Sequence, residues 1–123
     1  MSLLKSPLKT KCLTYSWANG AALSNVAITG AGFKPKAALI IMFPVGAATT
    51  TYPPGIDFVD EALLTKGVYN ITGTSQVATS LIAGNVTAYE EVTVVSFDAD
   101  GLTINGSNND TGVAIVFQIL VFG

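Results

Sequence analysis

The amino-acid sequence predicts an all-β fold, an antiparallel β-sandwich that is jelly-roll-like and has at most one short helix. Three observations predict it. Clusters of Gly, Pro, Asn and Asp interrupt the 123-residue chain at short intervals, as turns do. The runs between them are short and rich in Val, Ile, Thr, Phe and Tyr, which favour strands. Two of these runs are apolar on both faces, which is typical of strands that are covered on both sides.

The chain divides into an arm and a domain. Residues 1–10 contain Lys5 and Lys9 and are interrupted by Pro7, so we expect an extended N-terminal arm. Residues 11–123 contain neither an internal repeat nor a linker, and we expect one β-sandwich domain there. A chain of this length can bury roughly two-thirds of its unfolded surface without disulfides or metal.

The first two expected strands cover residues 11–17 and 22–28. In the first, strand alternation collects three large side chains on one face: Leu13, Tyr15 and Trp17. In the second, Val26 and Ile28 share a face. The Asn19-Gly20 pair between them is typical of a tight turn, so we expect the two strands to form a hairpin.

Two runs, residues 36–43 and 113–122, are apolar on both faces when they are drawn as strands. One face of such a strand fills the core of a sandwich. The other face must then lie under a loop, a second sheet or a neighbouring chain. At an exposed sheet edge, either run would promote aggregation.

The middle of the chain has weaker signals. Phe58 to Leu64 has apolar residues at helical spacings, with Asp57 available as an N-cap and Gly67 as a C-cap, so we expect a helix of at most two turns. Residues 70–88 are small and polar and fit either a loop or weak strands.

A hairpin is expected where residues 91–97 pair with residues 101–105 across the turn that begins at Asp98. Aspartate and asparagine side chains in and after this turn offer the oxygen ligands that Ca²⁺ prefers: Asp98, Asp100, Asp110, Asn105, Asn108 and Asn109. The twelve-residue calcium-loop spacing with its final Glu is missing. We therefore interpret these residues as turn chemistry and expect no metal and no cofactor.

Composition excludes several classes of function. The chain has six Lys, no Arg and a net charge of −2, so nothing in it indicates a nucleic-acid partner. It has no His and one cysteine, Cys12, which excludes the usual zinc site and an internal disulfide. We expect Cys12 to be a buried small side chain in a reducing compartment. The longest apolar runs are about half of the roughly 20 residues that a membrane helix needs, and no membrane partner is expected.

The adjacent carboxyl groups of Glu90 and Glu91 are the nearest approach to an acid–base pair. Neighbours on a strand point to opposite faces, so these two cannot act together as glycosidase carboxylates do. We expect a solvated strand end. Serine and threonine lack a histidine base that would activate them, and we expect no enzymatic activity.

Charged residues make up 11% of the chain, against about 25% in an average protein. Either neutral Thr, Ser and Asn side chains cover the surface, or part of the surface is buried against other subunits. We favour assembly into a homo-oligomer.

Two stretches carry a family resemblance: Gly32 to Ile41, which reads Gly-Phe-Lys-Pro-Lys-Ala-Ala-Leu-Ile-Ile, and Ser96 to Ile104, which reads Ser-Phe-Asp-Ala-Asp-Gly-Leu-Thr-Ile. Together they resemble small β-sandwich domains in virion proteins of tailed bacteriophages. The resemblance covers residues 12–123. It implies a structural protein on the outside of a capsid or in a tail, made in the host cytoplasm, that binds the major capsid protein or other virion proteins.

The resemblance and the scarcity of charge together predict a non-enzymatic capsid decoration (cement) protein, a homotrimer that stabilises the capsid exterior. The expected contact elements are the arm and the loops at 48–56 and 70–88. The expected contact residues are Leu3, Leu4, Lys5, Lys9, Tyr52 and Gln118. The alternative is a tail-fibre or receptor-binding module that recognises a host glycan through Tyr52 and Tyr69. A third possibility is a structural subunit of a tube or collar.

Overall fold

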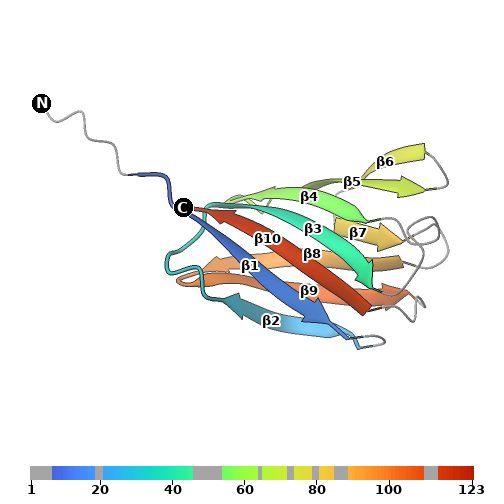
Figure 1. The fold of residues 1–123 in the computed structure, drawn as a ribbon, viewed down its shortest axis with the longest axis horizontal. Coiled ribbons are helices and arrows are strands. Elements are labelled where there is room, and N and C mark those ends of the chain that lie inside the picture. The colour runs from blue at the N-terminus through green and yellow to red at the C-terminus, as the bar shows by residue number, and fades with distance from the viewer. Residues whose placement is uncertain are drawn as a thin grey trace, which may run out of the picture.

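Two antiparallel sheets packed face to face form the described part of the chain, which confirms the expected β-sandwich (Figure 1). The computed structural model describes residues 7–18, 21–45, 54–63, 65–71, 74–78, 81–84, 89–109 and 114–123. Within these ranges all regular secondary structure is β-strand, and there is no helix.

The larger sheet has six strands in the order β1-β10-β3-β4-β5-β6. Their bounds are Thr10–Trp17 for β1, Ala114–Phe122 for β10, Ala37–Val45 for β3, Gly55–Asp60 for β4, Thr65–Ile71 for β5 and Thr74–Ala78 for β6. The two runs that are apolar on both faces become β3 and β10. Each has a neighbouring strand on both sides, so neither is left as an exposed edge.

The smaller sheet has four strands in the order β2-β9-β8-β7. Their bounds are Leu23–Thr29 for β2, Gly101–Asn109 for β9, Tyr89–Asp98 for β8 and Leu81–Gly84 for β7. The hairpin expected near Asp98 is confirmed, because β8 and β9 pair from Asp98 and Gly101 onward. In the described part of residues 70–88 (70–71, 74–78 and 81–84), strands are observed: the end of β5, β6 and β7 lie there.

The first and last strands are nested as in a jelly roll. β1 pairs with β10 in one sheet, and β2 pairs with β9 in the other. The middle of the chain departs from that pattern, since β3 to β6 and β7 to β9 pair consecutively as meanders. The register places the β2–β3 connection, the β4–β5 turn, the β8–β9 turn and Gly123 at one end of the sandwich, which we call the terminal end (Figure 1).

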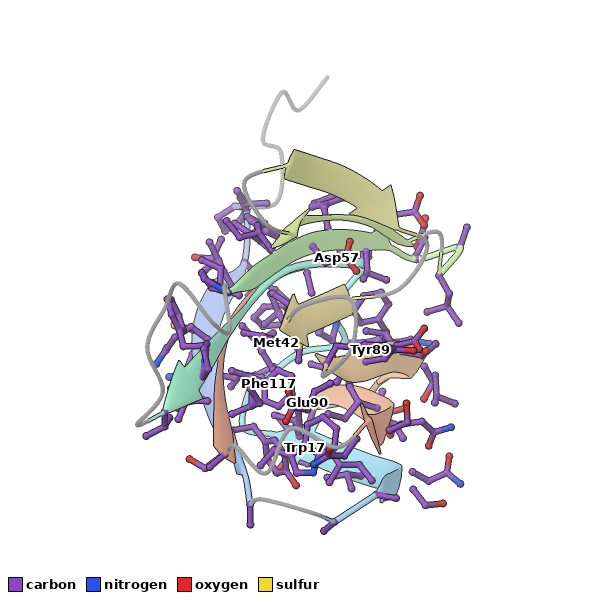
Figure 2. The ribbon with its side chains drawn as sticks, turned by 90° about the vertical axis from the view of Figure 1, so that its right-hand side faces the viewer. Trp17, Met42, Asp57, Tyr89, Glu90 and Phe117 are labelled. Carbon is purple, nitrogen blue, oxygen red and sulfur yellow. The ribbon has the colours of Figure 1, made fainter. Side chains whose placement is uncertain are left out.

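The core lies between the sheets and is dominated by β10 and β3. Phe117 and Ile119 on β10 and Ile40 and Met42 on β3 are at most 1% exposed (Figure 2). They share one cluster with buried residues of the smaller sheet, among them Val92, Leu102 and Ile104. Full burial of a side chain of this size stabilises the fold by about 1.5–3 kcal/mol. Phe117 also stacks on Trp17, with ring centroids 6.3 Å apart, which fixes β1 against the core.

The Asp100 side chain ties the β8–β9 turn to the connection between β2 and β3. Its Oδ1 accepts a hydrogen bond from the Gly32 N–H at 2.6 Å, and its Oδ2 accepts one from the Gly30 N–H at 3.1 Å. Its carbonyl oxygen accepts a third from the Ala31 N–H at 3.0 Å. Gly30 and Gly32 have φ angles of 105° and 77°, which side-chain-bearing residues rarely adopt. The turn role expected of Asp100 is therefore confirmed.

The expected hairpin between the first two strands is wrong, because β1 and β2 lie in different sheets. Each strand buries the face that the sequence indicated: Leu13 and Trp17 on β1, and Ile28 on β2. The two faces meet across the core and do not share one sheet. A sandwich and a hairpin satisfy the same alternation of side chains, so the pattern could not distinguish them.

The expected helix over Phe58 to Leu64 is also wrong. β4 runs as far as Asp60, and a turn follows in which the Leu63 N–H donates to the Asp60 carbonyl at 2.9 Å. Asp57, the expected N-cap, is an inward-facing strand residue that is 2% exposed. Gly67, the expected C-cap, pairs with it in β5. The inward aspartate concealed the strand alternation, and pairing with the buried β3 overrides the local helical spacing.

Replacing Gly101 with alanine will destabilise the fold strongly. A Cβ atom at this position would lie 1.9 Å from the carbonyl oxygen of Ile28, so β2 and β9 would have to separate. We expect Gly101→Ala to lower the free energy of unfolding by about 3 kcal/mol in urea denaturation. Ser107→Ala, on an exposed position of the same strand, serves as the control and should change it by less than about 0.5 kcal/mol. Equal stability of the two variants would contradict the prediction.

Candidate functional site

The outer face of the six-stranded sheet carries a continuous array of apolar side chains. β3, β10 and β4 each direct alternate residues away from the core, and those residues are apolar on all three strands except at Gln118 and Asp60. We call this surface the apolar face. It consists of Ala37, Leu39, Ile41, Phe43, Val45, Ile56, Phe58, Ala114, Val116, Leu120 and Phe122.

The strand register aligns these residues in rows across the sheet. One row runs from Cys12 through Leu120 and Leu39 to Phe58. The next row runs from Thr14 through Gln118 and Ile41 to Ile56. The described residues leave much of this face uncovered, since Phe43, Ile56 and Phe58 are 42%, 47% and 48% exposed. The cover that these strands require on their outer side is therefore missing from the described part of the chain.

A polar group near the middle of the apolar face has its hydrogen bonds supplied locally. The Gln118 Oε1 accepts from the Thr14 hydroxyl at 3.2 Å and from the Cys12 thiol at 3.6 Å. The expectation that Cys12 is buried is wrong, because the side chain lies on the outward-facing side of β1 and is exposed. Leu13, its neighbour in sequence, takes the inward position.

The outer face of the four-stranded sheet is chemically opposite. A shallow cavity of about 300 Å³ on β8 and β9 is lined by Glu91, Thr93, Asn105, Gly106 and Ser107. The Asn105 side-chain oxygen accepts a hydrogen bond from the Asn25 N–H at 2.6 Å, which joins β2 to this face. One exterior of the sandwich is thus apolar and the other offers hydrogen-bonding groups.

Among the described residues, two carboxyl side chains lie inside the sandwich. Asp57 is 2% exposed and Glu90 is 1% exposed, so the expected solvated strand end is wrong for Glu90. Figure 2 shows Glu90 directed between the sheets towards Phe117 and Trp17, while Tyr89 points to the other side of β8. Burial raises the pKa of Glu90 from its ordinary value of 4.5 to about 7, and a backbone hydrogen bond opposes part of this rise. Glu91, on the opposite face of the strand, is half-exposed.

Glu90 gives the fold a pH dependence with a defined sign. Because its folded pKa lies above its unfolded value, the folded state binds more protons between pH 4.5 and about 7. The free energy of unfolding should therefore fall as the pH rises through that window and become level above it. We expect Glu90→Gln to remove this fall and to be more stable than the unmodified chain at pH 8, by up to about 3 kcal/mol.

The check is urea denaturation between pH 4 and pH 8, with Glu91→Gln as the matched control. The control should retain the pH dependence of the unmodified chain. A Glu90→Gln variant whose stability falls with pH as steeply as the control's would show that the buried carboxyl group is not its source.

The predicted contact and glycan residues fall in different places. Leu3, Leu4, Lys5 and Tyr52 lie outside the described residues. Tyr69 pairs with Gly55 and Gln76 in β5, and its side chain lies outside the described part. Lys9 is exposed at the terminal end, where its carbonyl oxygen accepts from the Gly123 N–H at 2.9 Å. Gln118 is half-buried on the apolar face. The structure does not bring Lys9 and Gln118 together.

The described residues form neither a metal-binding cluster nor a membrane-spanning helix. No three His, Cys, Asp or Glu side chains in those ranges are arranged to hold a metal ion. The Asp98 carboxylate accepts from the hydroxyls of Ser96 at 2.7 Å and Thr103 at 2.6 Å, and Asp100 serves the turn described above. The described ranges also contain no helix long and apolar enough to cross a membrane.

Sequence reasoning missed part of the apolar face. The two strands that are apolar on both faces indicated that an outer cover was needed, but Phe58 was assigned to a helix and Ile56 to the loop at 48–56. The signal that could have located them is the period-two spacing of Ile56, Phe58 and Asp60 before a turn.

Comparisons with known proteins identify no relative: no protein-family model, no curated protein and no solved structure matches this chain.

Proposed function

We propose that this chain is a non-enzymatic structural protein that works by assembling with other protein subunits through the apolar face. The observation that carries the proposal is the exposure of Phe43, Ile56 and Phe58 on the outer side of a sheet whose inner side already fills the core. Covering what remains exposed of each such side chain stabilises a complex by about 1 kcal/mol. A contiguous apolar surface of this kind is typical of a protein–protein interface.

The dimensions of the apolar face suit such a contact. β10, β3 and β4 lie about 4.8 Å apart, and strands of six to nine residues rise about 3.3 Å per residue. The face therefore measures about 400 Å² in projection. Corrugation by side chains enlarges the accessible area towards the ~800 Å² that each partner contributes to a standard interface.

The role that best fits this surface is that of a bacteriophage capsid decoration protein on the capsid exterior. The resemblance of Gly32–Ile41 and Ser96–Ile104 to phage virion domains supports this role. The difference between the two outer faces supports this role as well. A subunit attached to a shell needs one face that is buried against the shell or against other subunits, and one face that stays in water. Sister copies, in a trimer, and the major capsid protein are the proposed partners.

A tail module that binds a host glycan is the second candidate. The observation that favours it is the convergence of a carboxylate, an amide and two hydroxyls around the shallow cavity of β8 and β9: Glu91, Asn105, Thr93 and Ser107. Polar groups of these types orient sugars in protein sites. Binding to a glycan array that is lost in Asn105→Ala would favour this candidate over the capsid role.

Assembly should depend on the apolar face. We expect the purified protein to sediment as an oligomer, and Ile56→Thr/Phe58→Thr to raise the dissociation constant by roughly tenfold or more. Threonine is β-branched, so the strand should persist. Thr93→Ala, on the polar outer face of the smaller sheet, is the matched control and should leave the sedimenting mass of the oligomer unchanged. A monomer at all accessible concentrations would refute the proposal.

Attachment should also resist salt. The one charged side chain that β3, β10 and β4 direct to this side is Asp60, at the end of β4. Raising NaCl from about 0.15 M to 1 M, where the Debye length falls from about 8 Å to 3 Å, should therefore not release the protein from particles. The measurement is the amount that remains with capsids after sedimentation. Release at moderate salt would mean that charge pairs hold the protein.

A further inference from the structure

The exposed large apolar side chains among the described residues gather on two surfaces. Seven are recorded there, and four of them lie on the apolar face: Phe43, Val45, Ile56 and Phe58. The other three are Leu8, Leu63 and Val95, which are 71%, 38% and 37% exposed. These three come from distant parts of the sequence and line two adjacent cavities at the terminal end of the sandwich. The apolar face does not account for this second group.

The two cavities are of the size that binding sites use. One, of about 600 Å³, lies between the β2–β3 connection, the β4–β5 turn and β8, and is lined by Leu63, Val95 and Glu61 among others. The second, of about 520 Å³, is lined by Leu8, Lys9 and Phe33 among others. Lys34 and Lys36 line both cavities. We call the pair of cavities the lysine groove. Ligand pockets typically measure about 300–1,000 Å³.

Two backbone irregularities place apolar side chains in the wall of the lysine groove. Leu63 has a φ of 59°, which is rare for a residue other than glycine, and its N–H is held by the Asp60 carbonyl at 2.9 Å. Val95 lies in the β-bulge of β8 between Val94 and Ser96, and bulges re-aim side chains. A strained turn and a bulge that both leave an apolar side chain in water, around the same cavity, indicate a surface shaped for contact.

The lysine groove is also positively charged. Lys9, Lys34 and Lys36 line it together with Glu61, so it holds three of the six lysines of a chain whose net charge is −2. Pro35 is buried between the two exposed lysines, and the Lys36 N–H donates to the Phe122 carbonyl at 2.7 Å. The backbone that carries these two cations is therefore fixed, and the groove offers apolar walls with ammonium groups beside them.

We propose that the lysine groove binds an extended acidic segment of a partner protein. An apolar side chain of that segment lies between Leu63 and Val95, and its carboxylates pair with Lys34 and Lys36. The arm of a second copy is a poor occupant, because residues 1–9 are themselves basic. Placing the partner in a virion rests on the proposed function, whereas the peptide chemistry of the groove does not.

The test uses two synthetic peptides and amide NMR spectra of the full chain. The probe is acetyl-Gly-Asp-Phe-Glu-Leu-Asp-Gly-amide, and the control peptide has lysine in place of each acidic residue. We expect the acidic peptide to cause saturable shifts at Lys36, Leu63 and Val95, and the basic peptide to cause none. Raising the salt to about 0.5 M should weaken the binding.

Matched variants separate the charge from the apolar wall. Lys34→Gln/Lys36→Gln should raise the dissociation constant by about fivefold, while Lys11→Gln, at the same end but lining neither cavity, should leave it unchanged. Val95→Thr should also weaken binding, and Thr93→Ser on the same strand should not. Among the substituted positions, Lys36 takes part in a backbone hydrogen bond of the groove and Val95 lies in the bulge of β8. Urea denaturation verifies that each variant is folded.

Three outcomes would overturn the proposal: no shifts at the groove with 2 mM acidic peptide, equal binding of the acidic and basic peptides, or unchanged binding in the double lysine variant. Binding to phosphatidylglycerol vesicles without binding to the acidic peptide would also overturn it, in favour of a lipid surface. The Ile56→Thr/Phe58→Thr variant keeps the groove intact. It should bind the peptide normally, so failure of the assembly proposal and failure of this one are distinguishable.

Discussion

The structure depends on the need of β3 and β10 for cover on both sides. Their inner residues, such as Ile40 and Phe117, form the centre of the core. Their outer residues, such as Leu39 and Leu120, are equally apolar and continue across β4 at Phe58. A single sandwich can satisfy one side of such strands. The outer side must then be covered by another molecule. This need for a partner connects the apolar composition of the chain to its proposed role.

The exterior divides into surfaces that would hold partners by different physics. The apolar face offers area without charge, so contacts there gain from removal of water and are insensitive to salt. The lysine groove offers smaller apolar walls with cations, so contacts there weaken with salt and select for acidic sequences. The polar exterior of β8 and β9 offers neither an apolar surface nor a cluster of cations, as suits a side that remains in water.

Local pattern predicted the strands that pair through short turns or that are uniformly apolar. β3, β10 and the β8–β9 hairpin belong to this group, and β1 was predicted from its regular alternation, because alternation and turn residues act within ten residues. β4 was missed because Asp57 faces inward, where alternation calls for an apolar residue. Glu90 shares its face of β8 with the buried Val92 and Val94, and Cys12 lies on the face of β1 opposite Leu13. The expectations for both were wrong because they followed residue type, since carboxylates are usually exposed and cysteines usually buried. The lysine groove combines five separate segments of the chain, so no window of sequence contains it.

The position of Cys12 gives the molecule a native reporter. The chain's one thiol lies in the same row as Leu120 and Leu39, at the β1 margin of the apolar face. A subunit whose apolar face is uncovered exposes this sulfur to alkylating reagents. A subunit whose apolar face is covered by a partner shields it. The rate of thiol labelling therefore measures, without any engineered tag, what fraction of the molecules have their apolar face covered by a partner.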